Sequence, residues 1–219
     1  MYTLYIGNKN YSTWSLRAWV LMRALGIPFA EKRILLYRPD SYAQLLEVSP
    51  SGRVPCLHDG DVIVWDTLAI VEYLAERHPG VWPEDSTARA WARSAAAEMH
   101  SGFASLRDEM GMNVRLRANK SPSDPVSADI ARILALWVEG RERFSQGGDF
   151  LCGAFGAIDA FWCPVAFRFQ TYRVPLAGVA AAYSRALLEL PAMRAWAADA
   201  ERELERIPGF DPPEAQAQQ

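Results

Sequence analysis

Hydroxyl side chains gather where a short apolar strand would pass into a helix. Tyr11, Ser12, Thr13 and Ser15 stand in the loop and in the first turn of the helical pattern that follows. The first N–H groups of a helix have no partner within the helix, and the helix dipole adds positive potential there. A hydroxyl at this point can cap the helix or donate a hydrogen bond to an anion, and the sequence is compatible with both functions.

A second helix start carries a carboxylate beside a hydroxyl. Asp66 and Thr67 precede an apolar helical pattern, LAIVEYLAERH, which ends at His78-Pro79-Gly80. Unpaired N–H groups and the positive end of the dipole suit a carboxylate ligand. Either residue can also cap the helix, and both functions can coexist because a cap already points to the place where a ligand would lie.

The histidines and cysteines are scattered and sparse. None of them stands at metal-ligand or C-x-x-C spacing, so we expect no metal site. An odd, small number of cysteines indicates buried thiols in a reducing compartment, which predicts a cytoplasmic location. The residues concerned are His58, His78 and His100, and Cys56, Cys152 and Cys163.

Strand and helix signals alternate in the first part of the chain. Gly26 is placed to end the first helix, and a strand reached through a helix is expected to be parallel to the one before it. Asp59-Gly60 supplies the backbone angles that a tight antiparallel hairpin requires. The order β-α-β-α-β-β-α follows, with strands at 2–6, 33–37, 54–58 and 62–65 and helices at 16–25, 40–47 and 67–77.

Beyond residue 78 the pattern contains helices only. Residues 79–86 carry two prolines and a glycine, which predicts a linker between domains. A stripe of apolar residues from Trp91 to Val114 predicts one long helix. We expect an all-α bundle over 87–210 and a disordered tail over 211–219, where apolar residues are few.

The bulk composition is that of an ordinary globular chain. Half of the 219 residues are apolar, 22% are charged, and the net charge is −3. This charge gives no reason to expect nucleic acid or an anionic membrane as a partner. The stretch from Phe150 to Phe167 approaches the length of a membrane span, but Pro164 and Asp159 within it favour a buried core helix.

The element order, followed by helices alone, resembles the glutathione S-transferase superfamily over nearly the whole chain. The most specific motif is Val54-Pro55, directly before the hairpin. In this family that peptide bond is cis, a minority geometry, and the valine backbone pairs with the cysteinyl backbone of glutathione. The resemblance implies a thioredoxin-like α/β domain over 1–78, a helical second domain and a homodimer.

A glutathione site built from three loops is a further implication of the resemblance. Ser12 matches the catalytic serine of serine-type members such as the zeta and theta classes, with Tyr11 as the rival hydroxyl. Its hydrogen bond, worth about 1.5–3 kcal/mol, would lower the pKa of the glutathione thiol from about 8.5. Arg53 is expected near the glycyl carboxylate, Thr67 near the γ-glutamyl carboxylate and Asp66 near the ammonium group. The expected glutathione-binding residues are Ser12, Thr13, Trp14, Arg53, Val54, Asp66 and Thr67.

The activity implied by the resemblance is conjugation in detoxification, with glutathione as co-substrate and a small electrophile as the second substrate. The electrophile pocket is expected between the domains, lined by Phe103, Arg107, Met110, Met112 and Phe167. One alternative is a zeta-like maleylacetoacetate isomerase, whose dianionic substrate needs cations in the pocket. The other is a glutathione-binding module of the same fold without catalysis.

Two motifs depart from the family pattern. Zeta-class loops read Ser-Ser-Cys-x-Trp-Arg, whereas Trp14 occupies the cysteine position and Leu16 the tryptophan position here, and Arg17 keeps its place. The missing cysteine argues against members that form mixed disulfides. In the second domain, Gly156 replaces the Ser or Thr of a capping box whose acid is Asp159, so the expected function of Asp159 is structural.

Overall fold

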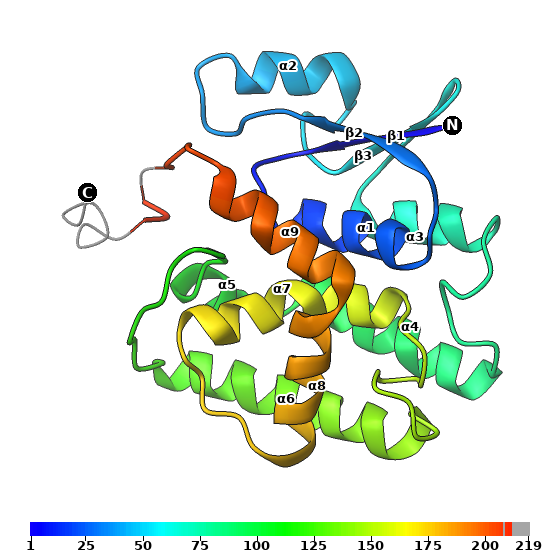
Figure 1. The fold of residues 1–219 in the computed structure, drawn as a ribbon, viewed down its shortest axis with the longest axis vertical. Coiled ribbons are helices and arrows are strands. Elements are labelled where there is room, and N and C mark those ends of the chain that lie inside the picture. Colours follow the sequence, from blue (N-terminus) through cyan, green and yellow to red (C-terminus); the bar gives the residue numbers. More distant parts are fainter. Residues whose placement is uncertain (208, 212–219) are drawn as a thin grey trace.

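A four-stranded mixed sheet organises the first domain. The computed structural model describes residues 1–207 and 209–211 (Figure 1). The central strand β1 pairs in parallel with β2 and antiparallel with β3, and β3 and β4 form the expected hairpin around Gly60. The strands, in the spatial order β2-β1-β3-β4, are β1 (Tyr2–Ile6), β2 (Phe29–Arg33), β3 (Cys56–Asp59) and β4 (Val62–Trp65).

Three helices complete this domain. Figure 1 shows α1 and α3 between the sheet and the helical domain, whereas α2 lies on the opposite side of the sheet. The predicted order β-α-β-α-β-β-α and the thioredoxin-like class are therefore confirmed. The three are α1 (Thr13–Ala24), α2 (Ser41–Val48) and α3 (Thr67–Ala75).

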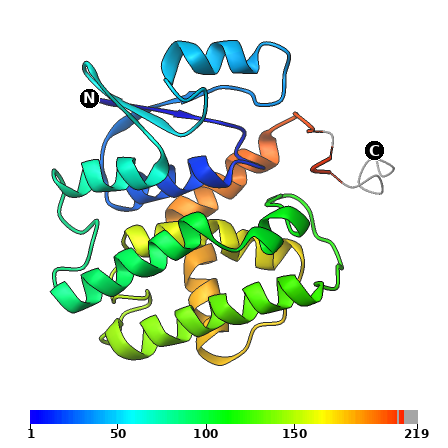
Figure 2. The same cartoon turned by 180° about the vertical axis from the view of Figure 1, so that it is seen from behind.

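The second domain is helical and packs on α1. Its central helix α7 is buried over almost its whole length and contacts α1 across the domain boundary. Figure 2 shows α4 and α6 side by side on the other face. The helices are α4 (Ser86–Ser101), α5 (Ala104–Glu109), α6 (Asp124–Phe144), α7 (Ala157–Thr171), α8 (Gly178–Glu189) and α9 (Pro191–Arg202).

Helix α7 accounts for the long apolar stretch in the sequence. Its side chains meet other helices instead of lipid, so the interpretation as a buried core helix is confirmed. Within the described residues no helix has the length and apolar character needed to cross a membrane.

The second strand lies four residues earlier than predicted. Apolar character pointed to 33–37, but β2 occupies Phe29–Arg33 at the edge of the sheet, where polar side chains reach solvent. The apolar residues beyond it cover the loop after β1 instead. Leu36 donates its N–H to Asn8 Oδ1 at 2.8 Å, and its side chain fills the space where a Cβ on Gly7 would lie. The predicted strand at 33–37 is therefore wrong.

The single long helix predicted from Trp91 to Val114 is also wrong. Helix α4 ends at Ser101, Gly102 is extended, and Phe103 adopts a left-handed conformation with φ 59° before α5 begins. A side chain at Gly102 would place its Cβ 2.8 Å from the carbonyl oxygen of Glu98, so glycine permits this sharp bend. After α5 the chain runs without a helix until α6.

The end of the chain is ordered one residue further than predicted. Asp211 is buried and accepts hydrogen bonds from Tyr11 and Asn113. The rest of the predicted disordered tail, 212–219, lies outside the described residues.

Candidate functional site

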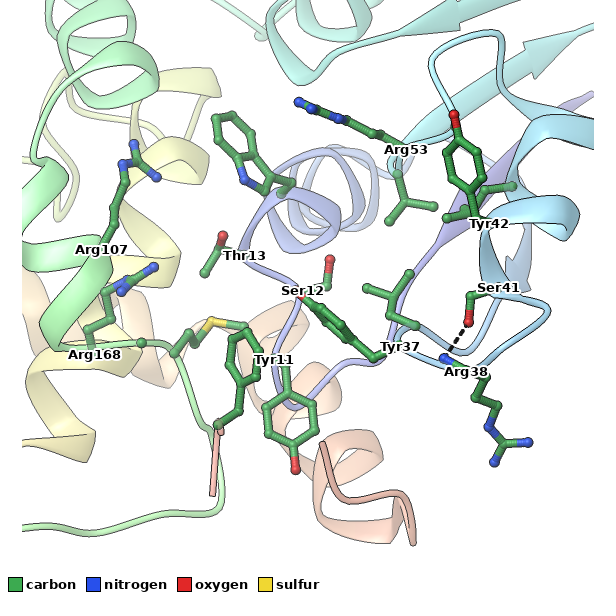
Figure 3. Close-up of a pocket in the computed structure, with 18 residues that line it drawn as sticks. Tyr11, Ser12, Thr13, Tyr37, Arg38, Ser41, Tyr42, Arg53, Arg107 and Arg168 are labelled. Atoms are coloured by element: carbon green, nitrogen blue, oxygen red, sulfur yellow. Dashed lines mark hydrogen bonds between the residues drawn. The ribbon is translucent and has the colours of Figure 1, made fainter. Parts of the chain in front are cut away.

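A cavity of about 550 Å³ lies between the domains, beside the start of α1 (Figure 3). The α/β domain contributes most of its wall and the helical domain closes the opposite side. The lining residues are Tyr11, Ser12, Thr13, Trp14, Leu36, Tyr37, Arg38, Ser41, Tyr42, Leu45, Gly52, Arg53 and Val54 from the first domain, and Arg107, Gly111, Met112, Arg168 and Phe210 from the second.

Ser12 is the N-cap of α1 and faces this cavity. Its Oγ accepts a 3.3 Å hydrogen bond from the N–H of Ser15 and donates to Ser15 Oγ at 2.7 Å. Ser15 Oγ in turn accepts the N–H of Gly7 at 3.0 Å, so the hydroxyl pair is fixed at the junction of β1 and α1. The hydroxyl of Ser12 thus has a capping function and, by rotation of its O–H bond, can donate into the cavity.

The hydroxyl of Tyr11 is bound on the far side of its ring. It donates to Asp211 Oδ2 at 2.5 Å and accepts from Arg115 Nη2 at 3.0 Å. Burial and the bond to Asp211 raise the pKa of Tyr11. Figure 3 shows this hydroxyl directed away from Ser12, so the geometry favours Ser12 over Tyr11 as the donor to a ligand in the cavity.

The loop before β3 forms another part of the wall. The Val54–Pro55 peptide bond is cis, as the resemblance implied. Arg53 and Val54 line the cavity together with Tyr42 (Figure 3). The backbone of Val54 is therefore placed along a surface that an extended peptide can follow.

Asp66 and Thr67 lie behind Trp14, outside the cavity wall. Thr67 Oγ1 donates to the carbonyl oxygen of Trp14 at 3.5 Å, which joins the start of α3 to the start of α1. Asp66 has φ 69°, caps α3 through a 2.9 Å bond from the N–H of Leu68, and keeps its carboxylate half-exposed. The structure thus brings both predicted residues beside the site.

The predicted electrophile pocket divides into two groups. Arg107 and Met112 line the cavity, whereas Phe103, Met110 and Phe167 are buried in the hydrophobic core. The bend after α4 accounts for Phe103 and Met110, because it rotates the following residues relative to a straight helix, whereas Phe167 lies on the buried helix α7. Placing these three core side chains in the pocket was therefore wrong.

Arg107, which is half-buried, and Arg168, which is buried, form the wall on the helical side. Arg107 donates to the carbonyl oxygens of Met99 and Gly102 at the end of α4. Arg168 donates to the carbonyl oxygens of Leu106 and Met110. Burial lowers the pKa of both groups, that of Arg168 to about 10. Guanidinium groups nevertheless stay protonated in proteins at neutral pH, so both are cations.

Several lining residues were missed by sequence reasoning. Tyr37 and Tyr42 are 67% and 64% exposed, and aromatic rings left in solvent beside a cavity suit ligand contact. Tyr37 was assigned to the predicted strand at 33–37 and so was not expected in a binding site. Arg38 and Gly111 carried no local signal, and Phe210 reaches the site from the far end of the chain.

Other reactive groups do not form a site. Among the described residues no cluster of three or more His, Cys, Asp or Glu side chains could hold a metal ion. Burial raises the pKa of all three thiols, that of Cys152 to about 12, so none is poised as a thiolate.

A family model described as the N-terminal domain of glutathione S-transferase matches residues 11–77. The match begins at the hydroxyl loop and includes the cis Val54–Pro55 bond and the start of α3. Residues 11–77 thus belong to the N-terminal domain family of the glutathione S-transferases. The sheet order and the helical second domain of the chain agree with this assignment.

Curated relatives align with parts of this transferase-like chain. A probable maleylacetoacetate isomerase from Caenorhabditis elegans is 33% identical over 105 residues, which are 45% of this chain and 49% of that protein. Glutathione S-transferase 1 from Dianthus caryophyllus is 29% identical over half of each chain. A stringent starvation protein A homologue from Haemophilus ducreyi is 22% identical over 73% of this chain and 71% of its own. The first two alignments thus span about half the length of the relatives.

Solved glutathione transferase structures match nearly the whole fold. A glutathione transferase homologue from Burkholderia gl BGR1 with bound glutathione has a TM-score of 0.68 at 21% identity, covering 92% of this chain and 98% of its own. Glutathione S-transferase E7 from Drosophila melanogaster has the same TM-score and identity, with 92% and 93% covered. At these identities the likeness shows the fold.

Proposed function

We propose that this chain is a glutathione transferase superfamily member and catalyses attack by the glutathione thiolate on a small electrophilic carbon. The observation that carries the proposal is the position of Ser12, whose hydroxyl stands at the N-terminus of α1 and in the cavity wall. Hydroxyl donors and helix N-termini both stabilise an anion. A thiolate placed there would face the helical side of the cavity, where a second substrate has room.

Glutathione would lie along the wall of the first domain. Its cysteinyl backbone would pair with Val54, and its glycyl carboxylate would reach Arg53. The γ-glutamyl end would extend past Trp14 to Asp66 and Thr67, where the helix start suits a carboxylate. The glutathione bound in the Burkholderia homologue supports glutathione as the ligand.

Ser12 would act by lowering the pKa of the bound thiol. An unperturbed thiol has a pKa of about 8.5, so only a few per cent is ionised at pH 7. Each unit of depression requires about 1.4 kcal/mol of preferential stabilisation of the anion. A charge-assisted hydrogen bond of about 1.5–3 kcal/mol supplies one or two units.

The test combines retention on immobilised glutathione with conjugation of 1-chloro-2,4-dinitrobenzene. Retention together with turnover supports the transferase. Retention without turnover of any electrophile in a broad panel favours a binding module of the same fold. Absence of retention contradicts the proposed function outright.

A second candidate function is isomerisation of maleylacetoacetate. The observation that favours it is the 33% identity to a probable maleylacetoacetate isomerase, together with the arginines of the cavity. Glutathione-dependent cis–trans conversion of maleylacetone, without consumption of glutathione, would distinguish this activity from conjugation.

Replacing Asp66 by Ala is expected to raise the Michaelis constant for glutathione about five- to thirtyfold and to change kcat little. The carboxylate would bind the γ-glutamyl ammonium group of glutathione equally in the ground state and in the transition state. Its loss therefore weakens both states by the same amount, which raises the Michaelis constant and leaves kcat nearly unchanged. Asp85→Ala is the matched control, because Asp85 caps α4 through the N–H of Ala88, whereas Asp66 caps the helix whose start is bonded to Trp14. Equal Michaelis constants for glutathione in the two variants would show that Asp66 is not part of the glutathione site.

We also propose a cytoplasmic homodimer. Strand β4 lies at the edge of the sheet, and its Val62, Ile63 and Trp65 are 39–47% exposed. An apolar patch on an edge strand suits association with a second copy of the chain. The three free cysteines suit a reducing compartment.

A further inference from the structure

The described lining of the cavity contains several arginines and no acidic residue. The arginines are Arg38, Arg53, Arg107 and Arg168. A concave surface with one sign of charge raises the local concentration of oppositely charged ligands. The cavity is therefore built for anions along its whole length, even though the net charge of the chain is negative.

Glutathione accounts for only one end of this positive surface. Arg53 lies beside Tyr42 at the expected glycyl end, and Arg38 lies below them near Tyr37 (Figure 3). Arg38 is also 3.9 Å from Glu205, which offsets part of its charge. Arg107 and Arg168 stand on the opposite side, beyond Thr13, where the second substrate would bind.

The carbonyl oxygens that hold Arg107 and Arg168 do not neutralise them. These acceptors are neutral, so the two guanidinium groups keep their full charges, with Arg168 buried and Arg107 half-buried. Burial is the first cause that lowers the pKa of Arg168, and repulsion from Arg107 is the second. Asp129 acts favourably on Arg107 but forms no ion pair with it, so the two neighbouring cations keep part of their demand for negative charge.

Arg17 adds a third charge directly behind the wall. It is fully buried, with its guanidinium carbon 4.4 Å from the ring centre of Trp14 and 4.9 Å from that of Phe161. Within the described part of the chain, none of its three guanidinium nitrogens has a hydrogen-bond partner. Asp66 acts on it favourably, whereas Arg107 and Arg168 repel it. A buried guanidinium group without hydrogen-bond partners destabilises the fold. An anion bound in the neighbouring cavity would offset part of this cost.

We propose that the second substrate is an electrophile that carries a carboxylate, which Arg107 and Arg168 bind while the thiolate attacks. This proposal rests on the proposed transferase function and narrows its substrate class. Planar guanidinium groups match a carboxylate through paired N–H donors. Met112 and Phe210 supply the apolar part of the same wall, so the substrate combines an apolar body with one anionic group.

A matched pair of probes isolates the carboxylate. In 4-chloro-3,5-dinitrobenzoate and its carboxamide, the thiolate forms the C–S bond, and the C–Cl bond breaks as chloride leaves with the bonding electron pair. Each kcat/KM is divided by the uncatalysed rate with glutathione, which removes the electronic difference between the two probes. This normalised kcat/KM is expected to be at least tenfold larger for the acid than for the amide. Equal normalised values for the two probes would overturn the proposal.

Variants assign this preference to the two arginines. Arg107→Met and Arg168→Met are each expected to reduce the acid-to-amide ratio about tenfold, and Arg168→Lys is expected to restore part of it. Arg117→Met is the control, because Arg117 is exposed and lies outside the cavity wall. Thermal melts of every variant separate a lost charge from a damaged fold. An unchanged acid-to-amide ratio in a variant that lacks both Arg107 and Arg168 would overturn the assignment.

A binding measurement separates this proposal from the transferase function. The glutathione conjugates of the acid and of the amide are prepared chemically, and their dissociation constants are measured by calorimetry on the wild-type protein. A preference of tenfold or more for the acid conjugate supports the carboxylate subsite even if no turnover is found. Equal affinities, or no affinity for either conjugate, overturn the proposal.

Discussion

Replacing Ser12 by Ala is expected to lower the rate of conjugation at pH 7 by about ten- to a hundredfold, with glutathione affinity unchanged within a few-fold. The range follows from the loss of about 1.5–3 kcal/mol of hydrogen bonding to the thiolate. The pKa of the bound thiol should rise, so the variant should recover part of its rate as pH increases. Titration of thiolate absorbance in the glutathione complex measures this pKa directly.

The capping function of Ser12 needs its own control, because the same hydroxyl begins α1. Ser123→Ala removes an equivalent cap from α6, where Ser123 accepts the N–H of Val126 and does not line the cavity. Both variants should lose about 1 kcal/mol of stability, but only Ser12→Ala should shift the thiolate titration. If Ser12→Ala keeps the wild-type titration while Tyr11→Phe loses it, Tyr11 is the donor.

The parts of the site that could be predicted are those with local signals. A hydroxyl before a helix, a Val-Pro before a hairpin and an Asp-Thr at a helix start each depend on neighbouring residues alone. Ser12 and Asp66 accordingly cap α1 and α3, and Val54–Pro55 is cis. These three segments meet in one place because β1, β3 and β4 are neighbours in one sheet.

The parts that could not be predicted depend on contacts between distant residues. The bend at Gly102 is held by Arg107, which caps the last carbonyl groups of α4, and by Asp129, which accepts the N–H of Leu106. Apolar spacing alone continues through this bend as one helix. Phe210 reaches the cavity because Asp211 is bound by Tyr11, about two hundred residues earlier in the chain.

The departure at Gly156 has a local steric reason. A Cβ at this position would lie 3.0 Å from the carbonyl oxygen of Val81, which already accepts the N–H of Ala157 at 2.8 Å. Glycine therefore lets the start of α7 approach the segment that enters the helical domain. The acid half of the capping box remains, since Asp159 Oδ2 accepts the N–H of Gly156 at 3.0 Å.

Replacing Asp159 by Ala is expected to lower the free energy of unfolding by about 3–5 kcal/mol at pH 5. The carboxyl group is fully buried and also accepts the N–H of Leu151 at 3.1 Å and the hydroxyl of Tyr183 at 2.8 Å. Its removal leaves three buried donors unsatisfied, at about 1–3 kcal/mol each before relaxation. Chemical denaturation measures the loss, and Asp149→Ala, an exposed carboxylate nearby, is the control and should change stability by less than about 0.5 kcal/mol.

The same carboxylate makes the stability of the wild-type protein depend on pH. Burial raises the pKa of Asp159 to about 6, against about 3.9 in an unfolded chain. Between these values the folded state keeps a proton that the unfolded state has released, so stability should fall as pH rises from about 4 to about 6, by up to about 3 kcal/mol. The destabilisation caused by Asp159→Ala should therefore be larger at pH 5 than at pH 7. Asp159→Asn should flatten the wild-type slope across this window, and an unchanged slope in that variant would assign the titration to another group.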